Sequence, residues 1–221
     1  MYGIMLRVWG DYALFSRPEM KVERVTYDVM TPSAARGILT AIHWKPAIRW
    51  LVDEIHVIKP IQFGNIRRNE VKSKIQSRDI NNAMKGKTEG FYLNTNSSDE
   101  RQQRASLILK DVEYIIKAHF EMTDQAGETD TPEKHYNIFL RRARQGQCFH
   151  HPYFGCREFP VNFELVESEE SLPKPIPLDK DLGYMLYDID FKHDRTPVFF
   201  RAQLEQGILR MDEKLKGRVN A

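Results

Sequence analysis

The stretch Val112–Met122, VEYIIKAHFEM, alternates between two kinds of side chain more regularly than any other part of the chain. Every second position is apolar or small, which is the spacing of residues on one face of a β-strand. That face carries Val112, Tyr114, Ile116, Ala118, Phe120 and Met122. The opposite face carries Glu113, Ile115, Lys117, His119 and Glu121. The stretch therefore predicts a strand with one buried face and one largely polar face.

The residues before this strand predict three further elements. Ile4–Gly10 is rich in β-forming residues and predicts a strand. Thr31–Trp44 begins with Thr-Pro, an N-cap followed by a proline suited to the first helical turn, and predicts a helix. Ile48–Ile61 predicts a second strand, in which the apolar positions change parity at Asp53-Glu54. Because a one-residue slip exchanges the two faces of a strand, that change predicts a β-bulge.

The residues after the central strand predict a second helix and a fourth strand. A helix begins at Thr131-Pro132 and ends at Gly146, and a strand follows over Tyr153–Val166. The order strand, helix, strand, insertion, strand, helix, strand is that of an α+β, ferredoxin-like fold, which includes the RNA-recognition module. We expect this domain to span residues 1–166. Residues 167–221 would form a proline-containing linker, a small C-terminal antiparallel sheet and a polar tail.

The insertion, at about residues 62–108, is polar and lacks sustained periodicity, so we expect a projecting β-hairpin or a flexible segment. Residues 61–110 contain ten Lys and Arg against five Asp and Glu, whereas residues 163–190 contain eight acidic residues against two lysines. The net charge of +2 hides this asymmetry. A basic segment is typical of polyanion binding, although a solvated lysine-rich loop fits the charge equally well. The candidate RNA-binding residues in it are Arg67, Arg68, Lys72 and Lys74.

Composition narrows the class of protein. The 221 residues are 41% hydrophobic and contain two cysteines, so a disulfide framework is not expected and a reducing cytoplasm fits. No apolar run approaches the roughly 18 residues of a membrane span. The N-terminus lacks the pattern of a signal peptide. We therefore expect a soluble cytoplasmic protein without a membrane partner.

Lys117 and His119 are the strongest candidates for catalysis because they lie two apart on one strand face. A lysine offers a positive charge to a phosphate, and a histidine can exchange a proton near neutral pH. Metal-free RNA cleavage needs both functions. A 2′-hydroxyl must lose a proton and the departing 5′-oxygen must gain one, while a cation stabilises the charge that develops on the non-bridging oxygens. The alternative is that an exposed strand face carries both residues without a function.

His43, near the end of the first predicted helix, could supply a second proton-transfer group. With Arg36 and Thr40 it forms a polar stripe at helical spacing. Arg36 and the nearby Lys45 are two further candidate RNA-binding residues. His43 could equally cap the helix. The helix should cover the apolar face of the sheet, from which Lys117 and His119 point away. The three side chains could then meet only at the margin of the sheet or across a twist or bulge.

Two further groups of residues invite a functional interpretation. Cys148, His150, His151 and Cys156 have a spacing that fits no zinc site well, so we expect no metal and no cofactor. Gly155 and Arg157 could bring backbone amides and a guanidinium to a phosphate, and are candidate RNA-binding residues. A simple bulge at the glycine is the alternative.

Four segments resemble the type I-C (Dvulg subtype) members of the fifth Cas family, in the RAMP superfamily. They are WGDYALFSRPEMKVERVTYDVMTPSAARGIL, AIHWKPAIRWLVDEIHVIKPIQF, LKDVEYIIKAHFEM and EKHYNIFLRRARQGQCFHHPYFGCREF. The resemblance runs over roughly residues 6 to 200 in the order of the family. It implies an RNA-recognition-like RAMP domain with a β-hairpin insertion and a small C-terminal sheet.

The resemblance also implies an activity, namely metal-independent cleavage of precursor CRISPR RNA at the 3′ base of the repeat hairpin. The products would carry a 2′,3′-cyclic phosphate and a 5′-hydroxyl. The enzyme would remain on the 5′ handle of the mature CRISPR RNA as a subunit of the interference complex. The catalytic lysine and histidine of the family match Lys117 and His119, while His43 stands where the family often has tyrosine.

Two other functions remain open at this point. Most of the fifth Cas family outside type I-C is expected to bind a CRISPR RNA that another enzyme has cut, without cutting it. Alternatively, the basic surface binds double-stranded DNA, as in a metal-dependent nuclease. Such a nuclease normally arranges several carboxylates around its ions, and the sequence shows no convincing cluster.

Overall fold

The structure, a computed structural model, is organised around one long strand, β5 (Arg101–Met122). It describes residues 2–20, 22–88, 92–191 and 194–212. β5 pairs antiparallel with β1 (Gly3–Ala13) on one side and with β3 (Ile48–Val57) on the other. β6 (Asn162–Val166) pairs with the free side of β1. The resulting strand order β6-β1-β5-β3 is that of a ferredoxin-like fold and confirms the predicted class.

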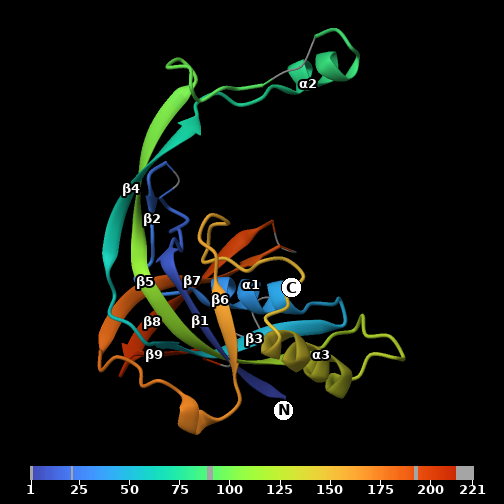
Figure 1. The fold of residues 1–221 in the computed structure, drawn as a ribbon, viewed down its shortest axis with the longest axis vertical. Helices are drawn as coiled ribbons and strands as arrows, with labels where there is room; N and C mark the ends of the chain where they lie inside the picture. Colours follow the sequence, from blue (N-terminus) through green and yellow to red (C-terminus); the bar gives the residue numbers. More distant parts are fainter. Residues whose placement is uncertain (1, 21, 89–91, 192–193, 213–221) are drawn as a thin grey trace.

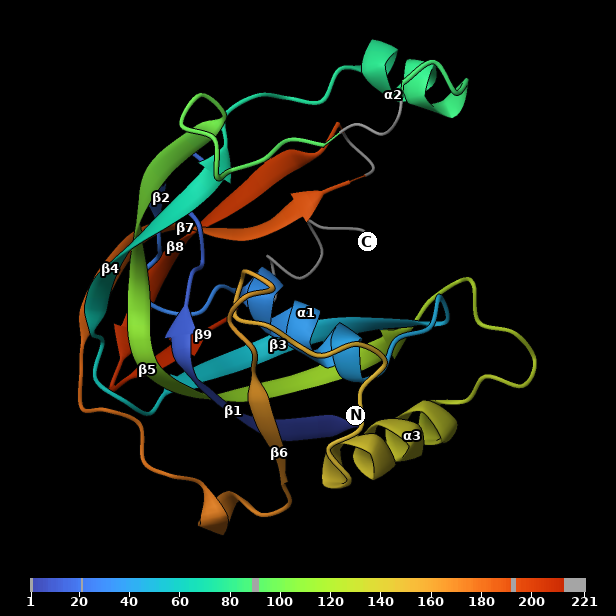
Figure 2. The ribbon, with the colours of Figure 1, turned by 45° about the horizontal axis from the view of Figure 1, so that its top comes forward.

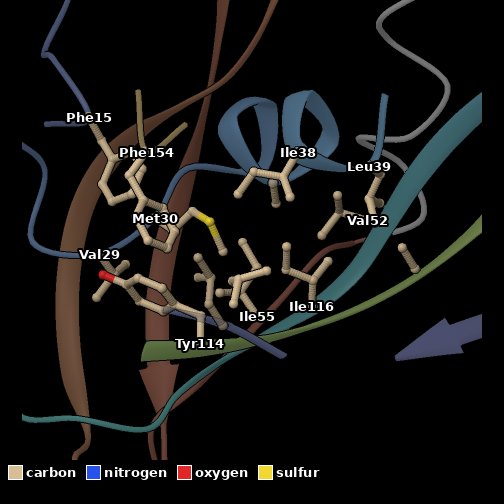
Figure 3. Close-up of a cluster of buried hydrophobic side chains, with 14 of the residues drawn as sticks. Phe15, Val29, Met30, Ile38, Leu39, Val52, Ile55, Tyr114, Ile116 and Phe154 are labelled. Carbon is tan, nitrogen blue, oxygen red and sulfur yellow. The ribbon is translucent and has the colours of Figure 1, made fainter. Parts of the chain in front are cut away.

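Two helices cover one face of this sheet (Figure 2). α1 (Pro32–Ile42) and α3 (Pro132–Arg144) both begin at the predicted Thr-Pro pairs. In each helix the threonine side chain accepts a hydrogen bond from a backbone amide of the first turn, which stabilises the helix start. Figure 3 shows Ile38 and Leu39 of α1 packed in the same cluster as Val52 and Ile116 of the sheet. The apolar face of the central strand therefore packs against the helices and forms one side of the core.

The connection from α1 to β3 contains the predicted irregularity. α1 ends at Ile42, two residues before the predicted end, and His43 is its C-cap. Along β3, Val52 pairs with Ala118 and Glu54 pairs with Lys117, so Asp53 is the extra residue of a β-bulge. The parity change in the sequence is confirmed as this bulge. The strand itself ends at Val57, four residues before the predicted end.

The basic insertion is a projecting hairpin (Figure 1). β4 (Phe63–Val71) pairs with residues 101–109 of β5, and α2 (Ser77–Met84) lies near the tip. Side chains along β4 alternate only between exposed and half-buried, and none of α2 is buried. Because neither element has a core-facing side, the sequence shows no sustained hydrophobic period there. The short β2 (Arg24–Val25) pairs with the same part of β5.

The C-terminal strands form a three-stranded antiparallel unit that is continuous with the main sheet. After the 3₁₀ turn η1 (Glu169–Ser171), β7 (Lys180–Asp190) pairs with β8 (Thr196–Glu205), and β8 pairs with β9 (Ile208–Arg210). β9 then pairs with β3, so all three strands extend the sheet beyond β3. The sheet curves enough that β7 also contacts α1 (Figures 1 and 2).

The predicted start of the fourth strand at Tyr153 is wrong, because the strand begins at Asn162. Residues 153–160 form a tight loop, closed by a bridge between Tyr153 and Pro160. Phe154 anchors this loop in the core, where it is fully buried. Gly155 follows with φ +79°, and a Cβ there would overlap the carbonyl oxygen of Leu14. Only glycine combines that backbone conformation with that close approach.

Candidate active site on the outer face of the sheet

Lys117 and His119 lie on the face of the sheet that the helices do not cover. On the helix side, the ring of Trp50 packs against Phe120 of β5 and Phe139 of α3. Since successive side chains of a strand point to opposite faces, Lys117 and His119 emerge on the other face. The predicted side-by-side placement of these two residues on one strand face is therefore present in the structure.

His119 is held by a carboxylate. Its Nδ1 lies 2.8 Å from Oδ2 of Asp53, the extra residue of the bulge in β3. The His119 side chain is only 6% exposed. A buried imidazole fixed by a hydrogen bond at one nitrogen has a defined ring orientation and presents the other nitrogen, Nε2, for chemistry.

Lys117 forms an ion pair with a carboxylate from the segment after β6. Its Nζ lies 2.6 Å from Oε1 of Glu169, which is in η1 after β6. The hydrogen bond and the charge of Lys117 lower the pKa of Glu169, and the charge of His56 lowers it further. Glu169 itself is 73% exposed, so a ligand could displace it. Lys117 thus already binds one oxyanion in the free protein.

A second histidine shares this face and was not singled out from the sequence. His56 of β3 is buried, and its Nε2 lies 2.7 Å from Oε2 of Glu54. The other oxygen of Glu54 contacts Arg210 of β9 at 3.3 Å. The parity change at the bulge places His56 on the same face as Lys117, but the strand register is needed to show that the two residues are neighbours. The face therefore carries a lysine and two imidazoles, the groups that phosphodiester cleavage without a metal requires.

His43 lies on the opposite side of the sheet. Its backbone carbonyl accepts a hydrogen bond from Trp50 Nε1, and its Nε2 lies 3.1 Å from Nδ1 of His135 in α3. His135 in turn contacts Asp130 at 3.0 Å. The structure thus brings Lys117 and His119 together but separates both from His43 by the sheet.

The environment of His43 favours its neutral form. Burial lowers the pKa of His43 to about 4, and the nearby charges of Arg142, His135 and Lys45 act in the same direction. Its Nδ1 is buried and has no hydrogen-bond partner in the described part of the chain. His43 is therefore a neutral residue between α1 and α3 in this structure.

The candidate RNA-binding residues divide into paired and exposed ones. Arg36 forms an ion pair with Asp188 of β7, with 2.7 Å between the closest atoms. Arg68 forms an ion pair with Glu158 and donates a hydrogen bond to Ser106 at 2.9 Å. The remaining candidates are exposed at the end of α1, on the insertion and in the tight loop, namely Lys45, Arg67, Lys72, Lys74, Gly155 and Arg157. Only this second group is available to a polyanion without breaking an internal ion pair.

Comparisons with known proteins place the chain in a family. The Cas5d family model, described as CRISPR-associated protein (Cas_Cas5), matches residues 3–212. The chain belongs to the Cas5d family. Two curated relatives carry the name CRISPR pre-crRNA endoribonuclease Cas5d. The protein from Mannheimia succiniciproducens is 54% identical, with 93% of each chain covered. The protein from Thermus thermophilus is 38% identical, with 95% of this chain and 91% of the relative covered.

Two solved structures share the overall fold of this chain. A structure titled "Crystal Structure of CRISPR-associated Protein" has a TM-score of 0.70 at 22% identity and covers 99% of this chain and 95% of its own. A functionally uncharacterized protein of Streptococcus mutans, SMU1763c, has a TM-score of 0.67 at 21% identity, covering 99% and 97%. At these identities the likeness supports the fold alone. Among the described helices, none has the length and apolar character needed to cross a membrane.

Proposed function

We propose that this protein is a metal-independent endoribonuclease that cleaves precursor CRISPR RNA within its repeat, at the 3′ base of the hairpin. The observation that carries the proposal is the outer-face pair Lys117 and His119, in which the lysine contacts the Glu169 carboxylate and the imidazole contacts the Asp53 carboxylate. The names of the two curated Cas5d relatives support the substrate. The precursor and mature CRISPR RNA, together with other subunits of a type I-C interference complex, are the proposed partners.

The proposed reaction is an internal transesterification. The 2′-oxygen attacks the adjacent phosphorus, its proton passes to a base, and the bond from phosphorus to the 5′-oxygen breaks. An acid protonates the departing 5′-oxygen, so the products are a 2′,3′-cyclic phosphate and a 5′-hydroxyl. Lys117 leaves Glu169 and stabilises the charge that develops on the non-bridging oxygens. His119 exchanges the proton through Nε2.

The role of His43 in this proposal depends on RNA binding. In the free protein the sheet separates His43 from the reacting centre, and burial keeps its imidazole neutral. Proton transfer is therefore assigned to His119. His43 can join it only if RNA rearranges the chain around the end of α1.

Mapping both ends of the products tests the proposed function. Purified protein is incubated with a cognate repeat RNA in EDTA, and the ends are identified by mass spectrometry. A 2′,3′-cyclic phosphate and a 5′-hydroxyl are expected at equal rates with and without EDTA. RNA that is bound but uncut would favour a non-catalytic subunit that binds the handle. Cleavage of nucleic acid only after a divalent metal is added would favour a metal-dependent nuclease, including one that acts on double-stranded DNA.

The hairpin arm is proposed to hold the RNA backbone. Arg67, Lys72 and Lys74 are exposed on β4 and just beyond it, and no carboxylate of the described chain pairs with them. Replacing all three with glutamine should weaken repeat binding and lower the slope of log Kd against log salt by about 2, if each contacts one phosphate. Fluorescence anisotropy over a salt series measures the slope. Arg101→Gln, at the end of the same arm, is a comparison variant for a single exposed charge. An unchanged slope in the triple variant would place the RNA elsewhere.

A further inference from the structure

Asp53, the extra residue of the bulge in β3, places its carboxylate beside Nδ1 of His119. We propose that Asp53 is a positioning residue for the cleavage reaction, which fixes the His119 ring and holds the proton of that ring on Nδ1. The inference rests on the proposed function, because His119 needs an orienting group only if it transfers protons. Neither the sequence pattern nor the names of the relatives assign a role to this aspartate.

The β-bulge explains how Asp53 reaches the histidine. In the register of the two strands His119 lies opposite Leu51, and Ala118 lies opposite Val52. In a regular strand Asp53 would lie opposite Lys117 and share a face with Leu51 and His119, but at the bulge Glu54 pairs with Lys117. The extra residue instead leaves the ladder, and its carboxylate reaches Nδ1 of His119. The backbone of Asp53 is also fixed, since its carbonyl accepts a hydrogen bond from the amide of Met211 at 2.9 Å.

The contact leaves one nitrogen of His119 for the substrate. A carboxylate accepts hydrogen bonds and donates none, so a neutral His119 must carry its proton on Nδ1. Nε2 makes no hydrogen bond with the described residues. It is also absent from the buried, unpartnered polar atoms of those residues, so it is accessible to a ligand. Its lone pair is therefore directed away from Asp53 and is free to accept a proton. When Nε2 is protonated, the carboxylate also faces the positive charge that forms on the ring.

The other charged groups of this face have different partners. Glu54 contacts His56 and Arg210, and Glu169 contacts Lys117. Among the described carboxylates, Asp53 is the one in hydrogen-bond contact with His119. The geometry therefore gives orientation of His119 to Asp53, and anion binding to Lys117.

The decisive variant is Asp53→Asn. Its side-chain amide can donate to Nδ1, which would move the ring proton of neutral His119 to Nε2 and remove the lone pair that the reaction needs. We expect single-turnover cleavage of repeat RNA to fall by about 100-fold to 10,000-fold, the range for losing a positioned acid or base. The Kd for repeat RNA should change by no more than about twofold. Glu121→Gln is the matched control, because it removes a carboxylate two residues beyond His119 that pairs with Arg49 at 2.8 Å. It should cleave at the parental rate.

A second measurement separates orientation from folding. Long-range ¹H–¹⁵N NMR of histidine-labelled protein, at about pH 8.5 and without RNA, distinguishes a protonated from an unprotonated ring nitrogen. His119→Ala identifies the signals. Parental protein should show His119 protonated on Nδ1, and Asp53→Asn should show the proton on Nε2. A His119 proton on Nε2 in the parental protein would overturn the inference, even if both variants fold poorly.

Different results would contradict the proposed function and the inference about Asp53. If the parental protein and His119→Ala both leave RNA uncut, the proposed function fails, and the role of Asp53 in catalysis fails with it. If the parental protein cuts, His119→Ala does not, and folded Asp53→Asn cuts at the parental rate, only the inference about Asp53 is wrong. Loss of RNA binding in Asp53→Asn at an unchanged melting temperature would also contradict it, because a positioning residue acts on the rate of cleavage.

Discussion

Lys117→Ala and His119→Ala should each reduce cleavage of repeat RNA by at least about 100-fold while leaving repeat binding largely intact. The lysine variant loses the cation beside the phosphate, and the histidine variant loses the group that transfers a proton. Both side chains lie on the face of β5 opposite the helix-covered core, so neither truncation removes a side chain from that core. Single-turnover kinetics at saturating protein, with anisotropy for binding, measures the two effects separately.

Lys59→Ala is the matched control for the lysine. Lys59 contacts the carboxylate of Asp111 at 2.6 Å, the same distance that separates Lys117 from Glu169. It lies outside the candidate site, so we expect parental cleavage. Parental cleavage by Lys117→Ala or by His119→Ala would show that the assignment of that residue is wrong. Equal losses in Lys59→Ala and Lys117→Ala would indicate a general effect of surface charge.

Acidification should destabilise the protein through His43. Burial lowers the pKa of His43 to about 4 in the folded state, whereas an exposed histidine titrates near 6.5. Between these values the unfolded chain binds a proton that the folded chain does not bind. Stability from this residue is therefore complete above about pH 6.5 and is lost as the pH falls toward 4. The upper limit of the loss is about 3 kcal/mol, from about 1.4 kcal/mol per pKa unit.

Urea unfolding at about pH 7.5 and pH 4.5 measures this loss. The carboxylates of the chain also respond to pH. The test therefore compares the change in the free energy of unfolding between the two pH values in the parental protein and in variants that lack the His43 imidazole. His43→Gln keeps a polar group beside His135, and His43→Tyr replaces the imidazole with a phenol that stays neutral over this pH range. Both should lose less stability between the two pH values than the parental protein, by up to about 2.5 kcal/mol. Identical losses in all three proteins would show that His43 does not contribute.

The sequence predicted those features that depend on local pattern. The alternation in Val112–Met122 placed the core face and the polar face of the central strand, and it placed Lys117 beside His119. The parity change at Asp53-Glu54 predicted the bulge, and the two Thr-Pro pairs predicted both helix starts. These signals are reliable because period and capping are set by residues close in the chain.

The partners of the candidate site could not be predicted in this way. The contact from Asp53 to His119 depends on the register between β3 and β5, and the contact from Glu169 to Lys117 joins residues 52 positions apart. Nothing in the local pattern around His56 marks it as a neighbour of Glu169. The loop at Gly155 was mistaken for strand because its apolar residues, such as Phe154, are buried as a strand's would be.

The pairing of β9 with β3 bears on self-association of the protein. β3 would otherwise be the edge strand of the ferredoxin-like sheet, with unpaired amides and carbonyls open to another chain. β9 covers this edge over Glu54–His56, directly beside the bulge. A fragment ending at residue 166 would expose that edge, and a second molecule could add a strand there. By pairing with β3, β9 therefore leaves no room for a second molecule to add a strand at this part of the edge, which is the part nearest to the candidate site.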